Sequence, residues 1–244
     1  MKAFSRWCVL LVCALLCLQV FFVLRIASMA VMAPESTSFE RSQVWQVFTH
    51  QGRLPWRQAW VDQDRMSASL KRAVLASEDS AFTQHHGIWW DSLEKAWDKN
   101  ARSKAQAERR AQRRGDDKPA EPKIVGGSTI TQQLAKNLFL SGERTLLRKG
   151  QEMLLTLGLE QVLSKRRILE IYLNNVEWGE GVFGAEAAAQ HYFRKPASVL
   201  NAWEAARLAV MLPRPRYFEQ RSQSAYLAGR ATVIMGRMND VVVP

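Results

Sequence analysis

The sequence GGSTITQQLAKN, residues 126–137, predicts a short amphipathic helix that is entered through two glycines and capped by a hydroxyl side chain. Ser128 or Thr129 can accept a hydrogen bond from a backbone N–H that the first turn of a helix leaves unpaired. A helix that begins at Thr129 turns by about 100° per residue, which gives it an inward apolar side and an outward polar side. The apolar residues are Ile130, Leu134 and Leu138, and the polar residues are Thr129, Gln132, Gln133 and Lys136.

This stretch has the features of an anion-binding site. The glycines form a flexible entry, the helix N-terminus offers backbone N–H donors, and Lys136 follows two turns later. The alternative is a capped surface helix with a solvated lysine, and the spacing alone leaves both interpretations open. A P-loop is excluded, because the pattern G-x-x-x-x-G-K-[ST] does not occur.

Length and charge limit the class of protein. The chain has 244 residues, of which 47% are hydrophobic, enough for one sizeable domain and an anchor. A net charge of +11 suits a phosphorylated substrate, an anionic membrane surface or nucleic acid. The sequence lacks zinc-finger spacing, an RNP-like aromatic motif and a basic region with heptads, so we expect no nucleic-acid partner.

Cysteine and histidine show no metal-binding pattern. Cys8, Cys13 and Cys17 all lie in one apolar run, so no intramolecular disulfide is available outside that run. The four histidines do not combine with them at the spacing of a metal site. No metal site or cofactor is evident, and the sequence leaves any dependence on divalent cations open.

An apolar segment over residues 7–24 is long enough to cross a membrane. As a helix it would span about 27 Å, close to the thickness of a bilayer core. Lys2 and Arg6 precede it, and this positive charge predicts a cytoplasmic N-terminus. We therefore predict a cytoplasmic tail over 1–6 and a transmembrane anchor over 7–30.

A cleaved signal peptide is the alternative for this segment, with residues 28–30 as the cleavage site. The apolar run is long for a signal peptide, and Arg25 interrupts the approach to the cleavage site, so a single-pass anchor is favoured. The rest of the chain would lie outside the inner membrane, as a connector over 31–65 and a domain over 66–244.

Helical periods dominate the domain, and no convincing run of alternating strands appears. Ser67 can cap a helix over 67–77, and Gly150 and Gly158 inside a later helix indicate close packing or a substrate near the backbone. Further helices are predicted over 144–163, 164–174 and 185–193. The last clear helix is predicted to begin near Asn201. In the connector, a short strand or helix is predicted near 44–48.

Residues 99–123 are poor in apolar side chains and carry a net charge of +5, from nine basic and four acidic residues. Gly115, Pro119 and Pro122 interrupt the segment. We predict a solvated, mobile loop. The alternative is a basic flap that meets anionic lipid.

The sequence EDSAFTQHHG, residues 78–87, places a carboxylate on the apolar face of a helix end. Burial of Glu78 would raise its pKa towards neutrality, as a general acid or base requires. The alternative is a surface Glu-Asp pair that follows a helix. His85 by itself is expected to be a packed, hydrogen-bonded histidine.

Four blocks together resemble the signatures of the family-51 glycosyltransferases, the peptidoglycan polymerases of the bacterial cell wall. Residues 126–137 match G-x-S-T-x-x-Q-Q-x-x-K-N, and 78–87 match E-D-x-x-F-x-x-H-x-G. Residues 148–160 resemble R-K-x-x-E-x-x-x-A-x-x-L-E, with Thr156 in place of Ala. Residues 165–193 resemble K-x-x-I-L-E-x-Y-L-N-x-x-x-x-G-x-x-x-x-G-x-x-x-A-A-x-x-Y-F. The resemblance covers about residues 66–215.

The resemblance implies a mainly α, lysozyme-like glycosyltransferase domain. Its donor would be the lipid-linked glycan strand, and its acceptor the 4-hydroxyl of lipid II. Inverting attack at C1 would form a β-1,4 link and release undecaprenyl diphosphate. The implied partners are lipid II, the growing strand and the inner membrane, with cell-wall or division proteins as further candidates.

The same resemblance assigns roles to individual residues. Glu78 would be the general base, and Glu152 would position groups or support them electrostatically. The implied substrate-binding residues are Ser128, Thr129, Gln132, Gln133, Lys136, Asn137, Arg148 and Lys149. Lys136, Arg148 and Lys149 would stabilise the departing pyrophosphate. From the residues alone, Arg148 and Glu152 can equally be a helix ion pair.

The chain departs from the bifunctional members of the family, which add a transpeptidase domain with S-x-x-K, S-x-N and K-[ST]-G motifs. Only S-x-x-K occurs, at residues 92–95, so we expect the monofunctional type without transpeptidase activity. The segment 99–123 is longer than in that type. The rival functions are a membrane-anchored lytic enzyme that cleaves glycan, and a non-catalytic cell-wall scaffold.

Overall fold

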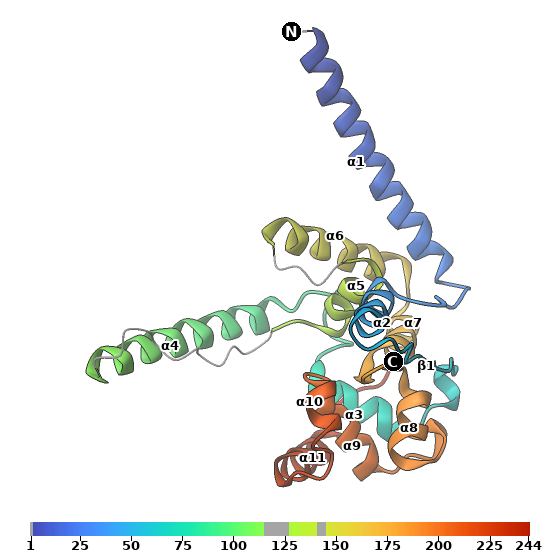
Figure 1. The fold of residues 1–244 in the computed structure, drawn as a ribbon, viewed down its shortest axis with the longest axis vertical. Helices are drawn as coiled ribbons and strands as arrows, with labels where there is room; N and C mark the ends of the chain where they lie inside the picture. The colour runs from blue at the N-terminus through green and yellow to red at the C-terminus, as the bar shows by residue number, and fades with distance from the viewer. Residues whose placement is uncertain (1, 115–126, 141–144) are drawn as a thin grey trace.

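Helices account for most of the regular structure, as predicted for a mainly α fold. The structure, a computed structural model, describes residues 2–114, 127–140 and 145–244 (Figure 1). Its helices are α1 (Lys2–Ser28), α2 (Ser38–Gln51), α3 (Ala68–Glu78), α4 (Trp90–Arg114), α5 (Ile130–Phe139), α6 (Leu146–Val162), α7 (Lys165–Asn175), α8 (Ala185–Phe193), α9 (Ala202–Met211), α10 (Pro215–Glu219) and α11 (Ala225–Arg237). The strands are β1 (Arg57–Gln58), β2 (Glu177–Gly179) and β3 (Val182–Phe183), and Gln63–Arg65 and Ala197–Val199 form 3₁₀ turns.

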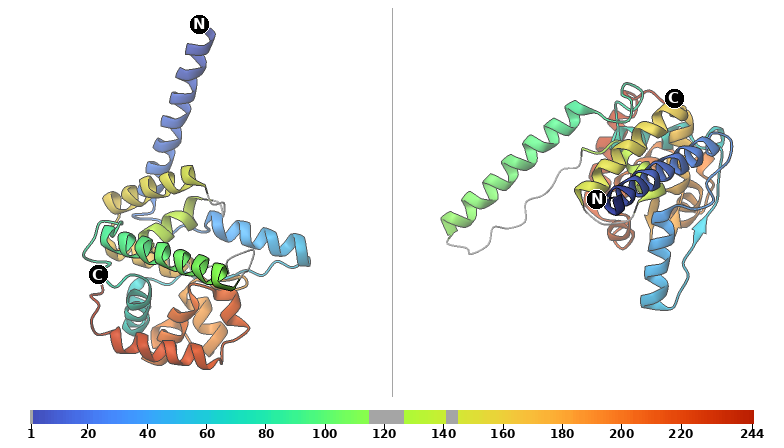
Figure 2. Two further views of the ribbon diagram at one scale, coloured as in Figure 1. Left: turned by 90° about the vertical axis from the view of Figure 1, so that its left-hand side faces the viewer. Right: turned by 90° about the horizontal axis from the view of Figure 1, so that it is seen from above.

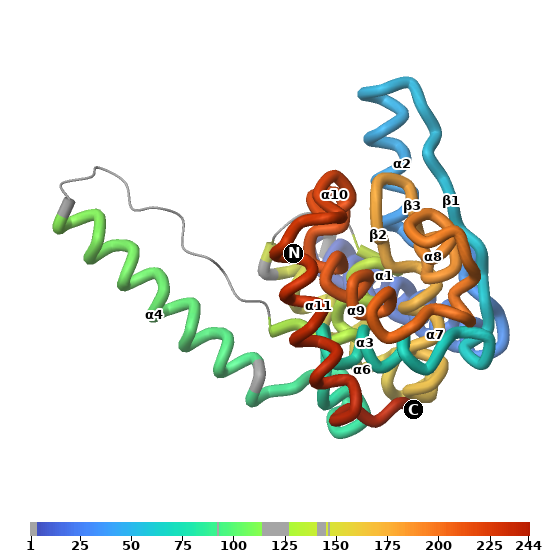
Figure 3. The backbone as a smooth tube through the Cα atoms, turned by 90° about the horizontal axis from the view of Figure 1, so that it is seen from below, coloured from blue at the N-terminus to red at the C-terminus, as the bar shows by residue number. Residues whose placement is uncertain are grey.

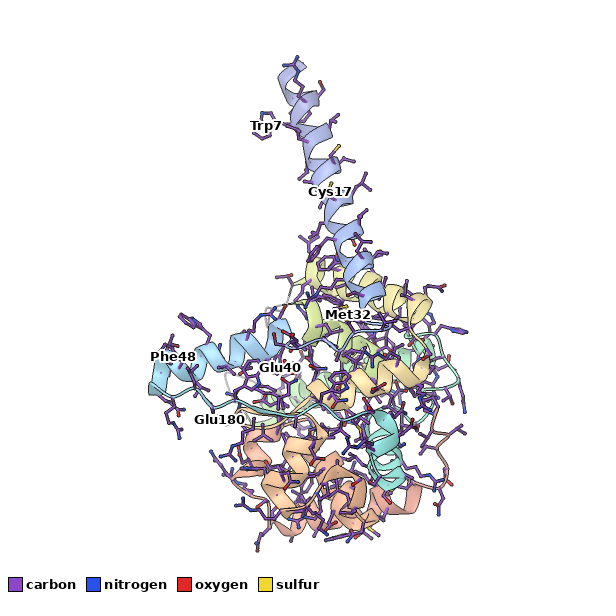
Figure 4. All side chains as sticks on the ribbon, turned by 90° about the vertical axis from the view of Figure 1, so that its right-hand side faces the viewer. Trp7, Cys17, Met32, Glu40, Phe48 and Glu180 are labelled. Atoms are coloured by element: carbon purple, nitrogen blue, oxygen red, sulfur yellow. The ribbon has the colours of Figure 1, made fainter. Side chains whose placement is uncertain are left out.

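Helix α1 extends away from the other helices, as Figures 1 and 2 show. Among the described residues, Phe4–Ser28 is the one helical segment long and apolar enough to cross a membrane. Its side chains, such as Trp7 and Cys17 in Figure 4, are exposed outside the body of the molecule. The helix covers most of the predicted anchor and begins before it, at Lys2.

The last turns of α1 are packed into the domain. The Ile26 side chain is 1% exposed, and a Cβ on Gly158 would lie 3.3 Å from its Cδ1 atom. The Arg167 guanidinium donates to the Met29 carbonyl oxygen at 2.8 Å. The close packing expected at Gly158 is therefore confirmed, whereas a Cβ on Gly150 would meet none of the described residues within 4 Å.

Two groups of helices form the body. In one, α3 packs on α9 and α11, and in the other α5 packs on α6 and α7. The predicted inward stripe of α3, including Leu70 and Val74, is fully buried, and the Ser67 hydroxyl accepts from the Leu70 N–H at 3.1 Å. The groups meet where α3 ends and α5 begins, because Asp79 accepts a hydrogen bond from the Ile130 N–H at 3.0 Å. This contact brings the first two signature blocks together.

A small sheet in the order β1-β3-β2 lies beside these helices, with β1 parallel and β2 antiparallel to β3. Its strands were not expected, because segments of two or three residues are too short to show an alternating pattern. Gly181, between β2 and β3, has a φ of +69°, and a Cβ there would lie 2.2 Å from the Pro55 carbonyl oxygen. Glycine is therefore required at this turn.

The predicted loop over residues 99–123 is wrong for residues 99–114. These residues continue α4, which projects from the body in Figures 1, 2 and 3. Alanine, glutamate, lysine, arginine and glutamine are all strong helix formers, which explains the helix despite the few apolar side chains. Residues 115–123 lie outside the described residues.

Two helices differ from expectation. In the connector, α2 is longer than the element predicted near residues 44–48, and a capping box between Thr37 and Glu40 begins it. Glu40 is buried at the base of α2 (Figure 4), and this burial raises its pKa to about 7. At the other end of the chain, α11 follows the predicted helix at Asn201 and packs on α3 and α9.

Candidate active site

Glu78 is the last residue of α3 and is partly buried. Its Oε2 accepts a hydrogen bond from the Gln133 side chain at 3.0 Å, and its Oε1 accepts from the Ser77 hydroxyl at 3.3 Å. Burial raises the pKa of Glu78, although the Gln133 and Ser77 hydrogen bonds and the charge of Lys136 lower it in part. Because its basicity is increased, the carboxylate is suited to accept a proton.

Gln133 is held in one orientation by Tyr172. The buried Tyr172 hydroxyl donates to Gln133 Oε1 at 3.0 Å, so the Gln133 NH₂ group must face Glu78. Burial raises the pKa of Tyr172, which keeps its hydroxyl protonated as a donor. The sequence predicted Gln133 as a substrate-binding residue, and the structure places it as a support for Glu78. Tyr172, fourteen residues beyond Gly158, was not singled out, although it lies within the fourth signature block.

Asp79 connects α3 to α5. Its Oδ2 accepts from the Ile130 N–H, and its Oδ1 lies 2.9 Å from His85 Nε2. The Gly87 N–H donates to His85 Nδ1 at 3.1 Å, so the ring proton is on Nε2 and is donated to Asp79. The expected structural role of His85 is supported by these contacts.

The start of α5 is a closed capping box. The Thr129 hydroxyl accepts from the Gln132 N–H at 3.2 Å, and the Thr129 N–H donates to the Gln132 side chain at 3.0 Å. The Thr129 hydroxyl also donates to the Gly87 carbonyl oxygen at 2.5 Å. The predicted cap by Thr129 is therefore confirmed. Both side chains are 2% exposed, so their polar groups serve the fold.

The prediction of free backbone donors for an anion at this helix start is wrong in its detail. The Ile130 N–H is bound by the Asp79 carboxylate, and the Gln132 N–H is bound by Thr129. The protein's own carboxylate therefore occupies the place where an external anion was expected. Gly126, the first residue of the predicted entry, lies outside the described residues.

A cavity of about 210 Å³ opens beside Glu78. Ser128 is exposed and lines it together with Glu78, and Trp89 and Arg237 complete the far side. The sequence analysis did not identify Trp89 or Arg237, because the first lies outside the fixed motif positions and the second beyond the matched blocks. The other two residues predicted on this helix, Lys136 and Asn137, are exposed and buried respectively.

A second charged cluster lies on α6. Glu152 is 3% exposed, and its carboxylate pairs with Arg148 at 3.1 Å and with Lys149 at 2.5 Å. The Arg148 Nε atom is buried and has no hydrogen-bond partner among the described residues. The ion pair that the sequence offered as an alternative is thus present, and it holds two cations next to α5, the helix of Lys136. Arg144, which shares this face in the sequence, lies outside the described residues.

The close packing of the four signature blocks requires glycine at position 87. Gly87 has a φ of +83°, and a Cβ there would lie 2.7 Å from the Thr156 methyl group and 2.8 Å from Glu160 Cγ. Glu160 in turn accepts from the Thr131 hydroxyl at 2.5 Å and from Lys165 at 2.8 Å. The first, second, third and fourth signature blocks therefore meet at this point.

Comparison with known proteins agrees with this arrangement. The profile of a family described as Transglycosylase matches residues 46–239. A biosynthetic peptidoglycan transglycosylase of Burkholderia thailandensis is 50% identical over 95% of this chain and 84% of its own length. Proteins with the same description from a Janthinobacterium species and from Bordetella avium are 48% and 47% identical, over 94% and 95% of this chain and 92% of their own lengths. The chain therefore belongs to the transglycosylase family.

Proposed function

We propose that this protein polymerises peptidoglycan by transferring a lipid-linked glycan strand onto lipid II. The observation that carries the proposal is Glu78, a carboxylate of raised pKa that opens into a cavity and is oriented by Gln133 and Tyr172. The names of the relatives support the same reaction class, because they are biosynthetic peptidoglycan transglycosylases.

In the proposed reaction, Glu78 removes the proton from the 4-hydroxyl of lipid II. As the proton moves to Glu78, the hydroxyl oxygen attacks C1 of the strand, the bond from C1 to the pyrophosphate oxygen breaks, and the configuration at C1 inverts. Undecaprenyl diphosphate leaves with the electron pair of that bond. A base of raised pKa suits this step, because a weakly acidic sugar hydroxyl is deprotonated only as the new bond forms.

The leaving pyrophosphate requires positive charge. Lys136 is an exposed cation on α5, close enough to influence the pKa of Glu78, and Arg148 and Lys149 lie on the neighbouring α6. We propose that these groups bind the pyrophosphate and that Glu152 holds the two α6 cations in place. In this view Glu152 is a positioning residue, and Ser128, which precedes α5, reaches substrate in the cavity.

We further propose that α1 anchors the protein in the inner membrane, with the N-terminus in the cytoplasm and the catalytic domain in the periplasm. Arg6 before the apolar run supports this orientation. The exposed apolar side chains Leu147, Leu154 and Leu157 lie on α6, the helix that packs on α1. The substrate lipid would remain in the same bilayer.

The direct test is polymerisation of fluorescent lipid II by the detergent-solubilised full chain, with products separated on a gel. We expect a ladder of glycan polymer from the wild-type protein. Glu78→Gln keeps the shape of the side chain but cannot accept the proton, so we expect the ladder to disappear and binding of lipid II to remain. No polymer from the wild type, or release of muropeptides from purified sacculi, would reject the proposal in favour of a scaffold or a lytic enzyme.

The proposed role of Lys136 has its own test. Lys136→Ala should lower kcat by about 100-fold, because a cation at a developing charge contributes roughly 3 kcal/mol. Lys104→Ala on α4 removes an equally exposed lysine and should leave the rate unchanged. Equal losses in the two variants would show that the positive charge acts diffusely.

We also propose that the chain has no transpeptidase activity, since it matches one of the three motifs of that reaction. The matching residues 92–95 lie on the first turns of α4, where Lys95 is exposed. Labelling of the protein by a fluorescent penicillin would contradict this.

A further inference from the structure

A second cavity, of about 440 Å³, has Ser77, the neighbour of Glu78 in the chain, among its lining residues. We name it the α10–α11 groove, after the helices that supply most of its side chains. Its lining is rich in arginine and tyrosine. The residues used below are Ser77, Arg214, Tyr217, Arg221, Tyr226 and Arg230.

The groove adjoins the candidate active site. Ser77 lines both the α10–α11 groove and the cavity of Glu78. Helix α11 also reaches both, because Arg230 lines the groove and Arg237, two turns later, lines the cavity of Glu78. A substrate bound at Glu78 can therefore extend into the groove.

The groove is positively charged without internal compensation. Within the described residues, Arg214 and Arg230 make no side-chain hydrogen bond or ion pair, and no acidic residue lines the groove. The Arg221 guanidinium lies over the Tyr217 ring, 4.3 Å from its centroid. Three arginines that line one concave surface attract anions, and carboxylates match the geometry of a guanidinium group.

Aromatic rings give this surface a fixed shape. Tyr226 stacks on the buried Phe218 with ring centroids 6.0 Å apart and an angle of 3° between the planes. Tyr217 packs edge-on against the same ring. The groove therefore combines anion-binding groups with flat apolar walls, which suits an organic chain that bears carboxylates better than it suits a free inorganic ion.

The position of the groove limits what can occupy it. Helices α10 and α11 lie at the end of the molecule opposite α1 in Figure 1, and they face the viewer in Figure 3. The lipid end of a membrane-bound substrate must stay on the side of α1. The occupant must then be a part of the substrate that lies away from its lipid. In peptidoglycan, that part includes the stem peptides, which carry free carboxylates.

We propose that the α10–α11 groove binds the carboxylates of the stem peptide on the glycan strand held at Glu78. This inference rests on the proposed function, since it concerns the substrate of the same reaction. It adds a substrate-binding region, formed by Arg214, Arg221 and Arg230, outside the signature blocks. Its consequence is that a strand with peptide-free sugars should bind more weakly than one with intact stems.

The test is direct binding of a lipid-free, uncross-linked fluorescent glycan fragment with intact stem peptides. Fluorescence anisotropy would measure the Kd of this fragment for the full chain in detergent. Every protein in the experiment carries Glu78→Gln to prevent turnover, and the protein with this substitution alone is the parent. An exposed ion pair contributes up to about five-fold to a Kd. We therefore expect the triple variant Arg214→Gln, Arg221→Gln, Arg230→Gln to bind on the order of ten-fold more weakly.

Three controls make the result specific. Arg72→Gln removes an exposed arginine from α3 and should not change the Kd. Substitution of the three groove arginines by lysine keeps the charge and should restore most of the affinity. A fragment whose stem carboxylates are amidated should bind the parent and the triple variant equally weakly. Thermal unfolding of each variant checks that it is folded.

Each other outcome overturns the inference. Equal affinity of the parent and the triple variant for the intact fragment would show that the arginines do not contact it. A loss that persists with the amidated fragment would show that carboxylates are not the ligand. Equally tight, arginine-dependent binding of an unrelated acidic peptide would assign the groove to an acidic protein partner. The proposed function itself is tested separately, by polymerisation of lipid II with the wild-type protein, which retains Glu78.

Discussion

At the residue scale, the candidate site depends on the hydrogen bonds that orient Glu78. A carboxylate at a helix end is a common surface feature, and what distinguishes Glu78 is its burial and its contact with Gln133. The Gln133 amide cannot turn over, because the Tyr172 hydroxyl donates to its Oε1 atom while its NH₂ group donates to Glu78. The two hydrogen bonds that join Tyr172, Gln133 and Glu78 thus allow the buried Tyr172 to fix the orientation of the Glu78 carboxylate.

These hydrogen bonds, together with the burial of Glu78, predict the pH dependence of the reaction. A general base acts in its deprotonated form, so the raised pKa of Glu78 should place the acid limb of the kcat/KM profile above the ordinary value of 4.5, with activity rising as pH increases. Tyr172→Phe frees the Gln133 amide and weakens a hydrogen bond that lowers this pKa. We expect the limb to move to still higher pH and kcat to fall by about ten-fold.

A matched control is available in Tyr192, whose hydroxyl donates to the Trp178 carbonyl oxygen at 2.7 Å. Tyr192→Phe also leaves a polar atom unpaired, and each variant should lose about 1–3 kcal/mol of stability. Only Tyr172→Phe should move the acid limb. A profile that shifts equally in both variants would show that loss of stability, and not orientation of Glu78, is responsible.

At the element scale, the signature blocks are brought together by the ends of helices. Asp79 after α3 binds the start of α5, and the segment that follows it turns at Gly87 against α6. The sequence predicted helices at the positions of α3, α5, α6 and α7 from their helical periods, with a cap and an apolar stripe identified for α3 and α5. It did not locate the contacts between them, since hydrogen bonds from one element to another have no period.

Gly87 tests this packing. Gly87→Ala introduces a Cβ into contact with Thr156 and Glu160 and forces alanine to adopt a positive φ. Together these effects should lower the free energy of unfolding by about 2–4 kcal/mol. Gly150→Ala, where a Cβ meets nothing within 4 Å, should instead raise stability by about 0.5–1 kcal/mol. Thermal unfolding in detergent measures both, and similar effects of the two substitutions would contradict the packing described.

Helix α4 shows how composition can mislead at this scale. Its few apolar residues predicted a loop over residues 99–123, but a polar sequence of strong helix formers can be helical without packing against a core. The short strands β1, β2 and β3 were missed for a different reason. Their composition gives no signal, and the pairing of β1 with β3 joins residues that are far apart in the chain.

At the scale of the whole molecule, α1 and the domain share a packed junction. Ile26 near the end of α1 is buried against α6, whereas the preceding turns of the helix are exposed. The orientation of the domain relative to α1 is therefore set by side-chain packing as well as by the connecting chain. This matters for the proposed reaction, because the substrate lipid and α1 would share one bilayer.

Substitution at the junction tests this arrangement. Ile26→Ala leaves a cavity beside Gly158 and should destabilise the domain by about 2–4 kcal/mol. Leu10→Ala, at a side chain that is 60% exposed, should leave the unfolding temperature in detergent unchanged. An unaffected Ile26→Ala variant would mean that the anchor and the domain are only loosely connected.

The sequence by itself determined the apolar N-terminal helix, the mainly helical class, the caps of α3 and α5, and Glu78 as the candidate base. These are local properties, since caps, apolar stripes and signature residues act within a few turns of chain. Only the tertiary structure decided that Asp79 occupies the start of α5, that Gln133 supports Glu78, that Glu152 pairs with two cations, and that α11 brings Arg237 to the cavity of Glu78. Those outcomes depend on contacts between residues distant in sequence, which packing alone selects.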